Sequence, residues 1–485
     1  MKKKKLLIAI VLLLVVLILK IVLLLTAKPK ITVDYVAEYN RISRPANYDP
    51  NDNAAQYYQK AFDYFIRMPK ELKTPLINWP EDFNNIEQAK LKGWLASNSQ
   101  AFGYLKIAAN KPYYWLERHA NKDNNMIGMM FPESEQFRYL ILAFLWNAKL
   151  EASEGRLQTA FENIIDCYKV GCQKCRTPSY TGEQLDGMGF KRAVLDSALV
   201  ILDRKRPNGL ALKSIQSALQ AEFDNDTYIP DYTTEKLFLY DTLQRTFAGN
   251  GLGTERLAWQ VPYPFNIGCE HMKEGNRWNC LIGPTRKQTA RQIEKVSAIS
   301  NQIMAKTPWQ IKNEGRDYFE EITDLKISSF FFRFLLLDPD TVFYSYHETK
   351  AQTKALIAIC AILRFKEGNH RFPASLDELV SADYLESVPM DPYSNGPLVY
   401  KLTEDNFKLY SIGEDFVDDG GSGEDKKRPI TVLNGKYIVP REYPPDIVYW
   451  PVRRLDNLRE KFEKREAARE AEARKGIQKA DQTKY

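Results

Sequence analysis

The chain has 485 residues, of which 44% are hydrophobic and 12% aromatic, and it carries a formal net charge of +6. A disordered chain would lack this apolar content, and the length exceeds what one hydrophobic core usually organises. The positive charge is concentrated in lysines 2–5 and in the C-terminal tail rather than on one face of a folded domain. The composition therefore excludes an intrinsically disordered protein and gives no indication of nucleic-acid binding.

Residues 1–30 contain a long apolar run. Four lysines precede it, and it begins at Leu6 and ends at Leu25, interrupted only by Lys20. A helix of that length matches the roughly 30 Å hydrocarbon layer of a bilayer. The run predicts a transmembrane anchor in the lipid bilayer, and a cleaved signal peptide is the alternative. Because the lysines favour the cytoplasmic side, we expect a single-pass protein of the inner (cytoplasmic) membrane with a cytoplasmic N-terminus and a periplasmic body.

Residues 31–340 are expected to form a mainly α-helical body. Aromatic residues recur at helical spacing over 53–68, and the clearest helix pair is predicted over 133–170, with a second over 191–223. The first pair resembles a tetratricopeptide-type hairpin, in which small residues occupy the positions where helices cross closely: Ala148, Gly155, Ala160 and Cys167. An irregular helical bundle is the alternative, because stacked repeats need about three copies.

The remaining parts outside the C-terminal module are less regular. Residues 224–285 are rich in glycine, proline and aromatic residues, so we expect a long ordered loop region there. A further helix is predicted over 286–304. Residues 327–337 are apolar on all sides but too short to span a membrane, which favours burial over contact with the membrane surface. The tail, 453–485, alternates charges and predicts a solvated helix or a disordered segment.

Residues 341–452 predict a small α+β module. A helix is expected over 347–366, and Ser375 with Glu378 three residues later forms a capping box for a short second helix. Alternating apolar residues, bounded by turn residues, then predict two β-hairpins, over 398–412 and 431–439.

This module resembles the C-terminal half of the major pseudopilin of type II secretion. The elements that carry the resemblance follow in the family's order: Gly368, Phe372-Pro373, 376–379, 388–392, 410–413, the acidic loop 415–425, and Asp446-Ile447 with Trp450. The resemblance implies an α+β fold. The N-terminus lacks the family's processing site, so assembly into a pilin-like filament is not expected. The layout of anchor, helical body and module also resembles membrane-anchored proteins of planctomycete-type bacteria.

The acidic loop is the strongest candidate site. Its carboxylates alternate with glycines, and Ca²⁺ prefers six to eight hard oxygen ligands. The matching pseudopilin loop binds calcium, so the resemblance implies a structural calcium ion held by Asp415, Asp418 and Asp419. A solvated acidic turn is the alternative, because this chain inserts about twenty residues after Asp425.

The six cysteines predict disulfide bonds in an exported body. Cys269 and Cys280 bracket a short polar loop and are the first candidate pair. Cys172 and Cys175 are further disulfide candidates. They close a predicted helix pair, whereas a thioredoxin-like redox motif opens a helix after a strand. Free thiols and a metal site are the alternatives, although no nearby histidine completes a zinc site.

The chain contains four histidines and none of the common hydrolase motifs. We therefore assign no catalytic residue and expect the protein not to be an enzyme. The leading hypothesis is protein–protein interaction or scaffolding among envelope proteins, in a secretion-associated role. The alternatives are an envelope hydrolase acting on glycan or peptide through the aromatic-rich residues 259–278, and a structural membrane spacer.

Overall fold

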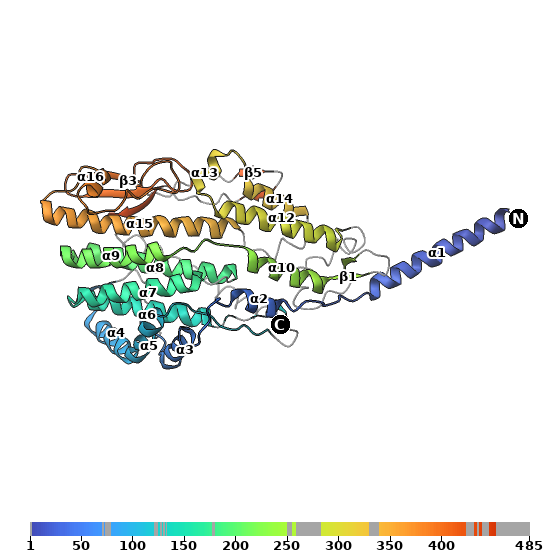
Figure 1. Ribbon diagram of the computed structural model, residues 1–485, viewed down its shortest axis with the longest axis horizontal. Coiled ribbons are helices and arrows are strands. Elements are labelled where there is room, and N and C mark those ends of the chain that lie inside the picture. The colour runs from blue at the N-terminus through green and yellow to red at the C-terminus, as the bar shows by residue number, and fades with distance from the viewer. Residues whose placement is uncertain are drawn as a thin grey trace, which may run out of the picture.

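The computed structural model describes most of the chain. The described ranges are 2–69, 72, 79–120, 125–126, 129, 131, 133–176, 180–249, 255–258, 283–328, 339–422, 431–433, 436–438 and 446–452. Within them the protein is mainly helical, with a few short strands, as the sequence predicts (Figure 1). Layers of roughly parallel helices form an elongated body, and the three-stranded sheet lies at the edge formed by the C-terminal module.

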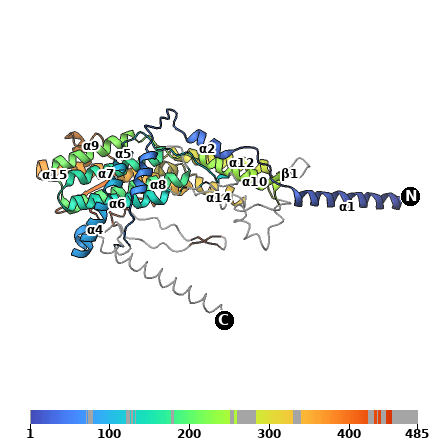
Figure 2. The same cartoon turned by 90° about the horizontal axis from the view of Figure 1, so that it is seen from below.

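The first helix, α1 (Lys2–Thr26), lies apart from this body. It leaves the end that carries α10 and β1 and continues along the long axis (Figure 2), and its described apolar side chains are exposed. No helix in the described part of the chain combines the length and apolar character that crossing a membrane requires.

This finding corrects the expectations that rested on the N-terminal run. The predicted transmembrane helix over residues 6–25 is wrong, and so is the fold class insofar as it includes one. The single-pass inner-membrane location, with a periplasmic body, rested on the same helix and is overturned with it, whereas the bilayer contact through that run stays a prediction.

Short helices form the first part of the body. They are α2 (Tyr35–Ser43), α3 (Ala55–Tyr64), the 3-10 helix η2 (Pro80–Asp82), α4 (Asn85–Ser97) and α5 (Ser99–Ala109). Asn84 begins α4, because its side chain accepts hydrogen bonds from two backbone N–H groups while the Glu87 carboxylate accepts from the Asn84 N–H. The buried Asn98 separates α4 from α5, and its side chain exchanges hydrogen bonds with the backbone of Ile66. A buried side-chain amide thus fixes where these helices meet.

Two long helix pairs form the centre of the body. They are α6 (Glu133–Ser153) with α7 (Leu157–Arg176), and α8 (Thr181–Lys205) with α9 (Gly209–Asn225). Gly155 adopts a φ of +86° in the first turn, where an L side chain would be strained. The two pairs lie where the sequence predicts them, and Ala148, Ala160 and Cys167 are fully buried at the helix contacts.

Glycines bring α7 and α8 into close contact. A Cβ atom added to Gly187 would lie 2.6 Å from the Cys175 Sγ, and one added to Gly171 would lie 2.9 Å from the Gly187 carbonyl oxygen. Side chains at either position would therefore separate the helices, since packed interiors lack the room to accommodate them.

The third part of the body contains α10 (Thr233–Thr246), β1 (Phe247–Gly249), β2 (Glu255–Leu257), α12 (Arg286–Met304), α13 (Pro308–Asn313) and α14 (Tyr318–Ser328). The helix predicted over 286–304 is confirmed. The loop predicted over 224–285 is wrong in part, because α10 buries Leu239 and Leu243 against Ile293. Residues 259–282 and 329–338 lie outside the described part of the chain.

The C-terminal module begins with a long helix, α15 (Pro339–Asn369), followed by α16 (Leu376–Ser381). Its strands are β3 (Val399–Leu402), β4 (Phe407–Ser411), β5 (Thr431–Leu433), β6 (Lys436–Ile438) and β7 (Ile447–Trp450). β3, β4 and β7 form an antiparallel sheet in that order, and β5 pairs with β6. Both predicted hairpins and the Ser375 cap are confirmed.

The module and the helical body share one hydrophobic core. That core runs from Ala54 in the first helices to Trp450 in the last strand, and α15 packs against both α8 and α9. In Figure 1, α15 lies between the sheet and these helices. The sheet is therefore held in a defined position relative to the body through α15.

Candidate functional site

The acidic loop follows β4 and turns at glycines. Gly413, Gly420 and Gly421 have φ values of +72°, +75° and +67°. The Asp418 Oδ1 accepts hydrogen bonds from the Tyr410 hydroxyl and the Gly420 N–H, both at 2.8 Å, and its Oδ2 lies 3.4 Å from the Lys401 Nζ. These contacts hold the Asp418 carboxylate in place.

The structure adds a carboxylate that the sequence analysis did not assign to this site. Asp446 is 3% exposed, and its Oδ2 accepts a hydrogen bond of 2.7 Å from the Gly421 N–H. Burial raises the pKa of Asp446, hydrogen bonds from Gly421 and Asp419 lower it, and the nearby charges of Asp418 and Asp419 raise it further. The Asp446 Oδ1 is buried without a hydrogen-bond partner among the described residues.

Two of the three predicted calcium ligands, Asp418 and Asp419, therefore act electrostatically on Asp446. Asp415, the third, is placed differently, because its Oδ1 accepts from the Val417 N–H within its own turn. Within the described ranges, no group of three or more His, Cys, Asp or Glu side chains is arranged to hold a metal ion. The sequence signal for Asp446 was its place in the Asp446-Ile447 pair, which the pseudopilin resemblance puts directly after the acidic loop.

The four described cysteines, which include Cys172 and Cys175, are free, buried thiols. The Cys172 thiol lies 3.9 Å from the Asp226 Oδ2, and the Cys175 thiol lies 3.7 Å from the Gln184 carbonyl oxygen. The predicted disulfide at these two cysteines is therefore absent, because the two thiols have different partners. Burial raises the pKa of Cys172 to about 12 and that of Cys175 to about 11, which makes both poor nucleophiles.

The other predicted sites lie in undescribed parts of the chain. Cys269 and Cys280, the first candidate disulfide pair, and the aromatic-rich residues 259–278 of the hydrolase hypothesis fall outside the described ranges. Among the histidines, His347 is 7% exposed and packs its ring against Phe343 at 4.6 Å. Burial lowers the pKa of His347 to about 3, so it is neutral at ordinary pH.

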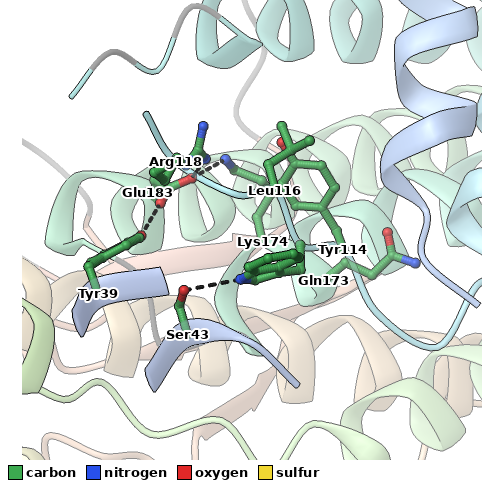
Figure 3. A pocket seen from close by; sticks show the side chains of 9 residues that line it. Tyr39, Ser43, Tyr114, Leu116, Arg118, Gln173, Lys174 and Glu183 are labelled. Carbon is green, nitrogen blue, oxygen red and sulfur yellow. Dashed lines mark hydrogen bonds and ion pairs between the residues drawn. The ribbon is translucent and has the colours of Figure 1, made fainter. Parts of the chain in front are cut away.

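A buried cluster of charges joins α2 and the segment after α5 to α7 and α8 (Figure 3). Arg118 forms ion pairs with Glu133 and with Glu183, the latter at 2.6 Å. Glu183 also receives hydrogen bonds from the Lys174 Nζ at 3.1 Å and the Tyr39 hydroxyl at 3.0 Å. Sequence reasoning missed this cluster because its members come from segments far apart in the chain.

The charges of this cluster balance. Burial raises the pKa of Glu183, but Lys174 and Arg118 outweigh it, and the pKa lies below its ordinary value. Burial lowers the pKa of Arg118, and Glu183 reverses that effect, so the guanidinium stays charged. The cavity beside the cluster measures about 20 Å³, room for about one water molecule. Two buried cations thus face two buried carboxylates beside a small cavity, an arrangement that connects elements rather than binding a ligand.

An open groove lies between α4, α5, α6 and α7. Its cavity measures about 430 Å³. Leu95, Phe102, Phe144 and Leu150 form its apolar lining, and Gly103, which is exposed, leaves space above α5. A second cavity of about 190 Å³ shares Lys92 and Leu150 with the first and continues it along α4 toward η2. The groove is large enough to receive several side chains of another molecule.

Comparison of the chain with protein-family models, with curated proteins and with solved structures finds no match. The resemblance of the C-terminal module to pseudopilins and that of the first helix pair to tetratricopeptide repeats therefore stay predictions, and the groove and the acidic loop must be interpreted from their own chemistry.

Proposed function

We propose that this protein acts in protein–protein interaction and binds a peptide segment of its partner in the groove between α4, α5, α6 and α7. The observation that supports the proposal is the solvent-open cavity of about 430 Å³, whose lining combines apolar side chains with one uncommitted amide. Peptide-binding grooves have this composition, because side chains need apolar pockets and the backbone needs hydrogen bonds.

The groove offers contacts for both parts of a peptide. Phe102 and Phe144 lie 5.1 Å apart, centroid to centroid, and form an apolar floor that is buried beneath the groove. Asn147 lines the groove, is partly exposed, and has no side-chain hydrogen bond to another described residue. A side-chain amide has both donors and an acceptor, so it can bind the N–H and the C=O of an extended backbone.

The charges at the rim favour an acidic partner segment. Lys92 is already paired with Glu154 at 2.8 Å, and Glu151 is paired with Arg156. Lys106 lies 5.7 Å from the centroid of the Phe144 ring and has no ion pair among the described residues. An acidic side chain next to an apolar one would therefore complement both Lys106 and the apolar floor of the groove.

A structural calcium ion in the acidic loop is a second part of the proposal. The buried Asp446 Oδ1 lacks a hydrogen-bond partner among the described residues, and Asp418 and Asp419 add negative charge beside it. Hard carboxylate oxygens of this kind are what Ca²⁺ prefers. The described side chains form no three-ligand group as they stand, so the carboxylates of Asp418, Asp419 and Asp446 would turn toward the ion when it binds. Its contribution would be to join the loop to the start of β7.

The groove can be tested by filling it. Gly103 lies in α5 and Gly93 in α4, and a Cβ atom added to either meets nothing within 4 Å. Both glycines are helical and exposed, but only Gly103 lines the groove. Gly103→Trp should block peptide binding, whereas Gly93→Trp is a matched control that changes helix propensity in the same direction.

Peptides selected from a random display library on the purified full chain would provide the ligand. We expect enriched sequences that pair an apolar with an acidic residue, bind the wild type and Gly93→Trp alike, and bind Gly103→Trp at least about tenfold more weakly. Absence of any enriched sequence, or equal binding to all three proteins, would contradict the proposal.

A further inference from the structure

A separate cavity lies between the helical body and the C-terminal module. It measures about 280 Å³ and is lined by Trp309, Lys312 and Asn313 of α13 and by Tyr393 and Phe416 of the module. The Trp309 backbone N–H donates a hydrogen bond of 3.1 Å to the Pro392 carbonyl oxygen, which holds the two walls together. The cavity lies at a junction between two packed elements, where small-molecule sites are often found.

Aromatic rings form the walls of this cavity. Tyr393 and Phe416 pack edge to face with their centroids 6.1 Å apart, and Trp309 is partly exposed. Phe416 has a φ of +61°, which is unfavourable for a residue with a Cβ atom. Strained backbone of this kind occurs more often at ligand sites than elsewhere. The faces of such rings carry partial negative charge and attract the polarised C–H groups of a saturated ring.

The side chains of Lys312, Asn313 and Tyr393, which line the cavity, have no ion pair or hydrogen bond to another described residue. The Lys312 Nζ lies 4.2 Å from the centroid of the Phe416 ring, and Lys312 has no ion pair within the described part of the chain. The Asn313 side chain has no hydrogen bond to another described residue. The Tyr393 hydroxyl is buried and has no hydrogen-bond partner among the residues described. A cation and an amide therefore line a space bounded by aromatic rings, whereas the Tyr393 hydroxyl is not exposed to it.

We infer that this cavity binds a carboxylated sugar of the uronic acid class. Its pyranose ring packs against Trp309, its carboxylate pairs with Lys312 above the Phe416 ring, and its hydroxyl groups bond to Asn313. A volume of about 280 Å³ accommodates one such ring. A neutral sugar leaves Lys312 without an anion, and a short aliphatic acid leaves the aromatic faces uncovered. The inference is independent of the peptide groove, which is formed by other helices.

Titration of the full chain with glucuronate tests the inference, with tryptophan fluorescence and saturation-transfer NMR as readouts. We expect saturable binding, with glucose about tenfold weaker because it lacks the charge-assisted bond to Lys312. Lys312→Gln should weaken glucuronate binding about tenfold and make glucuronate and glucose equal. Lys366→Gln is the matched control, because the Lys366 Nζ also lies over a phenylalanine ring, 4.1 Å from the Phe372 centroid, but does not line the cavity.

Trp309→Ala should weaken both sugars while the far-UV circular dichroism spectrum stays unchanged. The inference fails if glucuronate does not bind at millimolar concentration, if glucose binds as tightly, or if Lys312→Gln and Lys366→Gln behave alike. Tighter binding of benzoate than of glucuronate would also overturn it, since that result would indicate a site for flat aromatic acids.

Discussion

Replacing Glu183 with glutamine should destabilise the protein strongly. The carboxylate is 5% exposed and is contacted by Arg118, Lys174 and Tyr39. Glutamine keeps the shape and can still accept the Tyr39 hydrogen bond, but it leaves two buried cations facing Glu133 alone. Removing one partner of a buried ion pair costs about 3–5 kcal/mol, so we expect a loss of about 3 kcal/mol in the free energy of unfolding.

A double substitution separates the charge effect from the loss of packing. Lys174→Met removes the second cation while it keeps an apolar stem beside Tyr114 and Phe137, whose centroids lie 5.4 Å and 5.2 Å from the Lys174 Nζ. The double variant with Glu183→Gln should therefore be more stable than Glu183→Gln alone, by about 1–2 kcal/mol.

Urea unfolding followed by circular dichroism and tryptophan fluorescence measures these differences, with the slope m unchanged if the native state is the same. Glu38→Gln is the control, since Glu38 and Arg41 form an exposed ion pair that adds little stability. A loss below about 1 kcal/mol for Glu183→Gln, or a double variant no more stable than the single one, would refute the reasoning, because the cluster would then behave as a solvated surface pair.

Three further predictions follow from buried groups and close contacts. Because burial lowers the pKa of His347 from 6.5 to about 3, the unfolded chain binds its proton first. The contribution of His347 to the free energy of unfolding should thus be full above about pH 6.5 and fall toward pH 3 by on the order of 4 kcal/mol. His347→Leu is the control that lacks this pH dependence, and a wild-type urea midpoint that does not change with pH would contradict the prediction. Gly187→Ala should lower the free energy of unfolding by about 1–3 kcal/mol, since its Cβ would lie 2.6 Å from the Cys175 Sγ. Gly189→Ala is the control, because its Cβ would meet nothing within 4 Å, and it should be neutral or slightly stabilising. Equal effects of the two substitutions would contradict the close packing of α7 and α8. Millimolar Ca²⁺ should raise the melting temperature of the wild type but not of Asp446→Asn, measured by differential scanning fluorimetry, and a shift of equal size in both would place any bound calcium elsewhere.

Local sequence patterns predicted the helices that pack through one regular apolar face. The pair α6 and α7 was predicted because apolar residues recur every three to four positions and Gly155 marks the turn. The Ser375 cap and the hairpin of β3 and β4 were predicted for the same reason, since each depends on residues only a few positions apart. The apolar run at the N-terminus formed a helix as well, but its length and apolarity do not meet the requirement of a membrane span.

Predictions failed where distant residues decide the outcome. α10 lies in a region that composition suggested was a loop, and it is helical because Leu239 and Leu243 pack against Ile293, some fifty residues away. The thiols of Cys172 and Cys175 are adjacent on a helix surface but have partners on other segments, which spacing alone does not show.

The sequence by itself therefore determined the helical character of the body, the elements of the C-terminal module and the acidic loop, because propensity, periodicity and capping act within one or two turns of chain. Only the tertiary structure decided that Arg118, Lys174 and Glu183 share one buried cluster, that Asp446 joins Asp418 and Asp419, and that α13 meets the module around a cavity. Such sites form when elements distant in sequence pack together, and the free energy of packing depends on their combined shape and charge rather than on any local pattern.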